Sequence, residues 1–163
     1  MRTAGRSARM PAVRISAKGD YAVRAAIELA LAGDEPLSAD TIAARQDIPA
    51  FFMKKILNDM ARAGIVQSLR GRDGGNRLAR PAKEIAIADI LRAIEGPLAD
   101  VHGTAPERLE YPNNAEPLRE VWFALRANLR GVLETVTLDQ LATGRLPKRV
   151  ANLAQQDDAR LRR

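Results

Sequence analysis

The chain contains no cysteine and only one histidine, His102, among its 163 residues. Without thiolates it forms no disulfide, holds no cysteine-ligated zinc ion or iron–sulfur cluster and uses no cysteine nucleophile. Aromatic residues make up only 4% of the chain, and no apolar run approaches the roughly 18 residues of a membrane span. Because the basic start lacks the apolar core of a secretory signal, we expect a cytoplasmic protein. With no cofactor motif and one histidine, we expect no enzyme, no cofactor and no metal site.

Positive charge is concentrated in the first half of the chain. The formal net charge is +6, from 26 basic and 20 acidic residues. Residues 1–80 carry 14 basic and 8 acidic side chains, whereas residues 81–163 carry 12 of each. Such asymmetry favours a polyanionic partner, either nucleic acid or anionic lipid. A merely soluble basic protein is the alternative.

Capping residues and helical spacing predict three helices between residues 16 and 63. Ser16 is suited to cap a helix that runs to about Leu31, and Ser38 to cap a short helix over 39–46. A third helix follows Pro49 and ends near Ala63, before Gly64. The residues expected to face the core recur every three or four positions: Val23, Ala26, Ile27 and Ala30 in the first helix, and Phe52, Ile56, Met60 and Ala63 in the third.

The opposite face of the third helix is basic. It carries Phe51, Lys54, Lys55, Asn58 and Arg62. After this helix the helical spacing of the apolar residues ends. The pattern that follows predicts strands over 65–70 and 76–79, joined by a glycine-rich turn that contains Asp73-Gly74. A helix, a short helix, a third helix and a hairpin are the order of a winged helix-turn-helix, whose third helix enters the major groove. Taken separately, each feature has an alternative interpretation. The basic face of the third helix can be a solvated surface, and the glycine-rich turn can be an ordinary tight hairpin.

The second half predicts a linker and a long helix. A fourth helix follows from Ile87 and ends at Gly96, and residues 98–114 lack periodicity. Asn113 and Glu116 resemble a capping box for a helix over 115–143. That helix bears a heptad seam, which packs against a second copy or within the chain: Leu118, Val121, Trp122, Leu125, Leu129, Val132 and Val136. We interpret residues 1–13 as a disordered basic arm, 14–97 as the winged helix domain and 144–163 as a flexible basic tail.

Four segments together resemble the BadM/IscR/NsrR/CymR family of bacterial regulators, the Rrf type. They are ISAKGDYA at 15–22, IPxxFMxKIL at 48–57, AGIVxSxRGxxGGxxLAR at 63–80 and AIEGP at 93–97. The resemblance covers about residues 14–140. It implies a mainly α winged helix protein with a small β-hairpin, which binds double-stranded DNA as a homodimer and usually represses transcription.

The resemblance also indicates which residues contact DNA. They lie at the starts of the first two helices (Ser16, Lys18, Tyr21 and Ser38), in the third helix (Pro49, Ala50, Phe51, Lys54 and Lys55) and in the wing (Ser68, Arg70, Gly71, Arg72, Gly74, Gly75 and Arg77). The ring of Phe51 is suited to touch a thymine methyl group.

This sequence departs from the family pattern at two places. The family's sensing branch holds an iron–sulfur cluster with three cysteines, and the corresponding window, 98–115, has none. The family's Gly-Gly-Tyr is Gly74-Gly75-Asn76 here. The effector is therefore a small molecule between the linker and the last helix, a protein partner, or absent. A winged helix interaction module that controls or is controlled by a metabolic enzyme is the alternative function.

Overall fold

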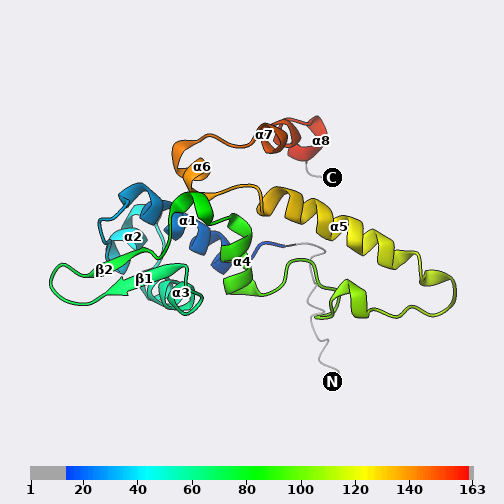
Figure 1. Cartoon of the computed structure of the whole chain (residues 1–163), viewed down its shortest axis with the longest axis horizontal. Helices are drawn as coiled ribbons and strands as arrows, with labels where there is room; N and C mark the ends of the chain where they lie inside the picture. Colours follow the sequence, from blue (N-terminus) through cyan, green and yellow to red (C-terminus); the bar gives the residue numbers. More distant parts are fainter. Residues whose placement is uncertain (1–13, 162–163) are drawn as a thin grey trace, which may run out of the picture.

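The computed structural model describes residues 14–161, so the predicted arm at 1–13 lies outside the described residues. Figure 1 shows α1–α4 and the hairpin gathered at one end, with α5 extending away from them. The elements in chain order are α1 (Ala17–Ala32), α2 (Ala39–Gln46), α3 (Ala50–Arg62), β1 (Val66–Leu69), β2 (Gly75–Leu78), η1 (Ala82–Glu84), α4 (Ile87–Glu95), η2 (Pro106–Arg108), η3 (Asn113–Ala115), α5 (Leu118–Leu133), α6 (Leu138–Thr143), α7 (Lys148–Ala154) and α8 (Asp157–Arg160). The mainly helical fold with a two-stranded hairpin confirms the predicted class.

Side-chain caps fix the starts of the first two helices as predicted. Ser16 Oγ accepts a hydrogen bond from the Gly19 amide at 3.0 Å. Ser38 Oγ accepts one from the Thr41 amide at 3.0 Å. Each bond satisfies one of the amides that a helix start leaves without an intrahelical partner.

The first helix buries a face one position away from the predicted stripe. Its fully buried apolar residues are Ala22, Ala25, Ala26 and Leu29. Val23, Ile27 and Ala30 are only half-buried against the same core. The sequence is compatible with burial of either face, because α1 is packed on several sides, by α3, α4 and α6. The alanine face lets these helices approach closely.

The buried face of the third helix also differs in part from the predicted face. Its buried residues are Met53, Ile56, Leu57 and Met60, so Ile56 and Met60 of the predicted stripe are confirmed. Phe52, predicted to be in the core, is 52% exposed. Ala63 is exposed as well. Since two adjacent stripes of this helix are apolar, periodicity alone did not select the inner one.

The hairpin is joined to the segment between α1 and α2. Strands β1 and β2 pair antiparallel, with Val66 opposite Leu78. The Leu37 amide donates to the Asn76 carbonyl at 2.9 Å, and the Asn76 amide donates to the Leu37 carbonyl at 2.8 Å. Leu37 thus adds a third short strand-like edge, which anchors the wing to the helices.

The long helix ends ten residues before the predicted boundary of 143. Helix α5 stops at Leu133, because Thr135 donates its hydroxyl to carbonyls of the preceding turn and Thr137 forms a capping box with Gln140. Val136, assigned to the dimerisation seam, is 2% exposed and lies in the chain's own core. This placement removes Val136 from the seam.

Helix α6 completes the winged helix domain. The Ile87 amide donates to the Val136 carbonyl at 3.0 Å, and the Leu138 amide donates to the Ile85 carbonyl at 2.9 Å. The Leu138 side chain is fully buried. The domain therefore consists of 14–96 together with 136–143. Beyond it, the predicted flexible tail contains the short helices α7 and α8.

Residues 97–117 lie along α5. The predicted capping box of Asn113 and Glu116 does not form, because α5 begins after Pro117, whose fixed φ suits a helix start. Instead, Trp122 Nε1 donates to the Tyr111 hydroxyl at 2.7 Å. Glu107 forms an ion pair with Arg126 at 2.8 Å. The linker is thus attached to the helix that follows it.

Candidate nucleic-acid interface

The outer face of α3 combines an aromatic ring with two lysines. Phe51 is 76% exposed, and Lys54 and Lys55 are exposed on the same side of the helix. Pro49 and Ala50, at the start of α3, are exposed too. The inner face packs in the core, so one helix can dock on its own domain and still present these side chains to a groove.

Two ion pairs restrain this face. Lys54 Nζ lies 3.4 Å from Asp40 Oδ1 of α2. Lys18 Nζ of α1 lies 2.7 Å from Asp59 Oδ2 of α3. The hydrogen bond from Lys18 lowers the pKa of the Asp59 carboxyl, with smaller contributions in the same direction from the charges of Lys18, Arg62 and Lys55. Within residues 14–161, no carboxylate lies within ion-pair distance of Lys55, which leaves its charge available to DNA.

The predicted phosphate contacts at the start of α1 already have partners inside the chain. Ser16 Oγ caps its helix and donates to Glu95 at the end of α4. Lys18 is held by Asp59. The half-buried ring of Tyr21 lies under the Arg24 guanidinium, 5.5 Å from its centroid. Ser16 and Lys18 therefore join α1 to α4 and α3, and the contact of Tyr21 with Arg24 lies within α1. Ser38, by contrast, remains exposed at the start of α2.

The wing presents two arginines at its tip. Arg70 and Arg72 are exposed, and Figure 1 shows the loop between β1 and β2 projecting beyond the helices. Arg77 is half-buried, and its Nε donates to Gln67 Oε1 at 3.1 Å. Ser68 donates to the Asn76 side chain at 3.0 Å. Arg70 and Arg72 are therefore better placed than Arg77 to reach DNA.

The glycines of the wing have different internal roles. A β-carbon on Gly74 would lie 2.3 Å from the Leu69 carbonyl oxygen, and one on Gly75 would lie 2.8 Å from that of Leu37. The space around Gly71 is open, at a φ of +105°. The turn itself thus requires glycine at 74 and 75, a steric reason independent of any approach to DNA.

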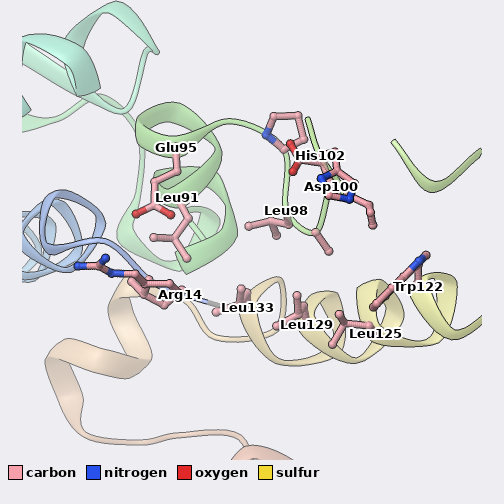
Figure 2. A pocket seen from close by; sticks show the side chains of 14 residues that line it. Arg14, Leu91, Glu95, Leu98, Asp100, His102, Trp122, Leu125, Leu129 and Leu133 are labelled. Atoms are coloured by element: carbon pink, nitrogen blue, oxygen red, sulfur yellow. The ribbon is translucent and has the colours of Figure 1, made fainter. Parts of the chain in front are cut away.

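A cleft of about 390 Å³ lies between the end of α4, the 97–102 segment and α5. Figure 2 shows that Leu125, Leu129 and Leu133 of α5 lie across this space from Leu91 and Leu98. Four polar residues also line the cleft: Arg14, Glu95, Asp100 and His102. The leucines of α5 therefore face a space that residues 14–161 leave open.

Asp40, Asp59 and Glu95 were not predicted from the sequence as residues of this site. Asp59 and Arg62 stand three residues apart on α3, a visible helical signal. The partners of the other two lie on different elements, at Lys54 and Ser16. Only the folded chain brings these pairs together.

Comparison with known proteins identifies the family. The model described as "Iron-dependent Transcriptional regulator", of the Rrf2 family, matches residues 15–144. The chain belongs to the Rrf2 family. Over 149 residues it is 48% identical to a candidate HTH-type transcriptional regulator of Mycobacterium tuberculosis, covering 91% of each chain.

Two solved structures share the fold. CymR, the global cysteine regulator of Bacillus subtilis, has a TM-score of 0.70 and 31% identity, over 81% of this chain and 98% of CymR. T. potens IscR has a TM-score of 0.65 and 27% identity, over 93% and 94% of the two chains. This Rrf2 protein is therefore an HTH-type transcriptional regulator and not an enzyme. In the described part of the chain, no helix is long and apolar enough to cross a membrane.

The residues present do not fit the iron centre suggested by the family description. The chain has no cysteine to supply thiolate ligands. Between residues 14 and 161, no three histidine or acidic side chains are grouped as metal ligands. Since iron–sulfur clusters depend on thiolates, these residues do not supply the ligands of such a cluster.

Proposed function

We propose that this Rrf2 protein is a homodimeric repressor that binds a palindromic operator in the bacterial cytoplasm. The observation that carries the proposal is the outer face of α3. Phe51, Lys54 and Lys55 are exposed there, while the opposite side of the helix is buried in the domain. Arg70 and Arg72 extend the positive surface to the wing. A helix in the major groove and an arginine-bearing hairpin beside it account for both features.

The dimer forms through α5. Leu118 and Val121 of the seam are 38% and 55% exposed, and Trp122, Leu125 and Leu129 line the open cleft. Such a row of apolar side chains on an extended helix is typical of a helix that packs against another copy. We assign the second copy's α5 as the occupant of this surface, without Val136.

Two-fold symmetry then determines the form of the operator. Paired α3 helices read inverted half-sites in successive major grooves, about 34–36 Å apart. Phosphate contacts make the affinity fall as the salt concentration rises. Each phosphate neutralised steepens the slope of log affinity against log salt concentration by about 0.9. A dimer on such a site within a promoter represses by occupying DNA that polymerase needs.

The test is selection of bound fragments from random duplex DNA, followed by anisotropy titration of the selected duplex at two salt concentrations. A palindromic motif preferred over competitor DNA supports the regulator. Weak, salt-sensitive binding without a motif, both in purified protein and after addition of cell extract as a source of effector, contradicts it and favours the protein-interaction module. Transcription in vitro from a promoter that carries the motif then separates a repressor from an activator.

A further inference from the structure

Two adjacent phenylalanines face solvent at the start of the recognition helix. Phe51 is 76% exposed and Phe52 is 52% exposed. They are two of only three phenylalanines in the chain. Since folding strongly favours burial of a phenyl ring, an exposed pair in a protein with few aromatics indicates a surface that another molecule covers.

Phe51 lies on the face of α3 that carries the lysines. Lys54, Lys55 and Asn58 follow it by three, four and seven residues, so the four side chains lie along one side of the helix. Together they line a shallow hollow with Arg62. Phe51 stands in the first turn, the part of a recognition helix whose side chains reach base edges.

The neighbouring ring restrains the orientation of Phe51. The two ring centroids lie 5.8 Å apart with an interplanar angle of 70°, an edge-to-face contact. Such contacts stabilise one arrangement of a ring pair over others. Lys54 is drawn toward Asp40 of α2, at 3.4 Å. The ring is therefore presented between Lys54, whose charge is partly neutralised, and Lys55, which has no ion-pair partner among the described residues.

The chemistry of a phenyl ring limits what it recognises in DNA. It carries no hydrogen-bond donor, so it does not bond the acceptors of guanine or adenine. The one apolar group that base pairs display in the major groove is the C5-methyl group of thymine. Lysines beside the ring supply the attraction to phosphate that brings it there.

We propose that Phe51 is a specificity-determining residue, which reads a thymine in each operator half-site through the methyl group. The inference rests on the proposed function, because it requires α3 to lie in the major groove. It adds the base that this helix selects and the atom group by which the base is selected. Burial of one methyl group predicts a loss of roughly three- to tenfold in affinity when the methyl is absent.

The experiment compares thymine with deoxyuracil, which differ only by this methyl group. Each thymine of the selected operator is replaced in turn by deoxyuracil, and the wild-type protein is titrated by anisotropy. We expect one symmetric pair of positions at which affinity falls roughly three- to tenfold. Phe51→Ala lowers affinity for the thymine operator and removes the difference between thymine and deoxyuracil at that pair.

Two variants serve as matched controls. Phe51→Leu keeps an apolar side chain and retains discrimination. Lys55→Ala weakens binding to both duplexes equally, because the lysine contacts phosphate rather than the methyl group. Circular dichroism melting checks that Phe51→Ala folds, as expected for a ring exposed to solvent.

The outcomes separate this inference from the proposed function. If no motif is selected, the operator-binding function fails and the role of Phe51 fails with it. If a motif is selected but no thymine is sensitive to deoxyuracil, the role of Phe51 is overturned and the regulator stands. Discrimination that survives in Phe51→Ala overturns it in the same way.

Discussion

Lys18 and Asp59 join α1 to α3 through an ion pair of 2.7 Å. Lys18 stands two residues after the cap of α1, and Asp59 lies in the last turns of α3. The carboxylate is thus a negative charge beside Lys55 and Arg62 of the surface proposed to meet DNA, as Asp40 is beside Lys54. It sets the position of α3 and also reduces the positive potential of that helix.

Replacement of Asp59 by asparagine is expected to strengthen DNA binding. The change frees Lys18 and removes one negative charge near Lys55 and Arg62. Affinity measured by anisotropy should rise at low salt, and the log–log salt slope should steepen by up to about 0.9. Asp34→Asn, on an exposed turn, is the control and should change neither quantity. Unaltered affinity and slope in Asp59→Asn would place Lys18 and Asp59 away from the DNA.

The same pair predicts acid sensitivity. Because the hydrogen bond from Lys18 lowers the pKa of Asp59 in the folded chain, the charged carboxylate stabilises the fold above its unfolded pKa of about 3.9. This contribution is lost as the pH falls below that value through the folded pKa. Urea unfolding at pH 7 and pH 3 should show that wild type loses stability more than Asp59→Asn does. Since both side chains are partly exposed, we expect a difference of about 1 kcal/mol or less. Identical pH dependence in the two proteins would contradict this role.

Removal of a wing arginine is expected to weaken DNA binding without affecting the dimer. Arg70→Ala or Arg72→Ala should reduce the salt slope by about 0.9 if the side chain contacts one phosphate. Arg77→Ala is the comparison, because Arg77 is engaged with Gln67 and should have the smaller effect. Wild-type affinity in both tip variants at physiological salt would remove the wing from the interface.

Substitution of Gly75 by alanine tests the junction of the wing and the helices. The new β-carbon would lie 2.8 Å from the Leu37 carbonyl oxygen, too close without a shift of the backbone. We expect a loss of about 1–3 kcal/mol in thermal or urea unfolding, together with weaker DNA binding. Gly144→Asn is the control, since its left-handed conformation suits asparagine and no atom of the described residues lies within 4 Å of an added β-carbon. Equal stability of the two variants would show that the Leu37 segment moves freely.

Disruption of the seam should produce monomers. Leu125→Asp places a charge in the apolar cleft, and Trp122→Ala removes its largest side chain. Light scattering coupled to size exclusion should report a dimer for the wild type and a monomer for Leu125→Asp, with weaker operator binding. Asn128→Asp, on the exposed side of α5, should remain dimeric. A Leu125→Asp dimer of normal mass and stability would show that the seam packs within one chain.

Sequence patterns predicted the positions of the helices and strands better than which face of each helix is buried. Local signals fixed the starts of α1 and α2, because Ser16 and Ser38 act on amides three residues away. The inner face of α3 was predicted correctly at Ile56 and Met60 but wrongly at Phe52 and Ala63, because the adjacent apolar residues Phe52 and Met53 can each begin a stripe that contains Ile56 and Met60. Only packing against the other helices selects between them.

The candidate site was predictable where it depends on exposure and charge. Phe51, Lys54 and Lys55 occupy the outer face of α3, as their spacing indicates. The partners of Lys18 and Ser16 were not predictable, since Asp59 and Glu95 are distant in sequence. The heptad pattern of the sequence continues to Val136, but α5 ends earlier. Its end depends on the hydroxyls of Thr135 and Thr137, which form hydrogen bonds with nearby backbone groups.

The chain leaves the winged helix domain after α4 and returns to it at Val136, where strand-like hydrogen bonds join residues 136 and 138 to residues 87 and 85. The 39 residues between Gly96 and Val136, residues 97–135, are thus an appendage whose two ends are fastened at one place. Closing a longer loop costs little additional entropy. The length and chemistry of this appendage can therefore change while the winged helix domain, with the α3 surface that we propose to meet DNA, keeps its shape.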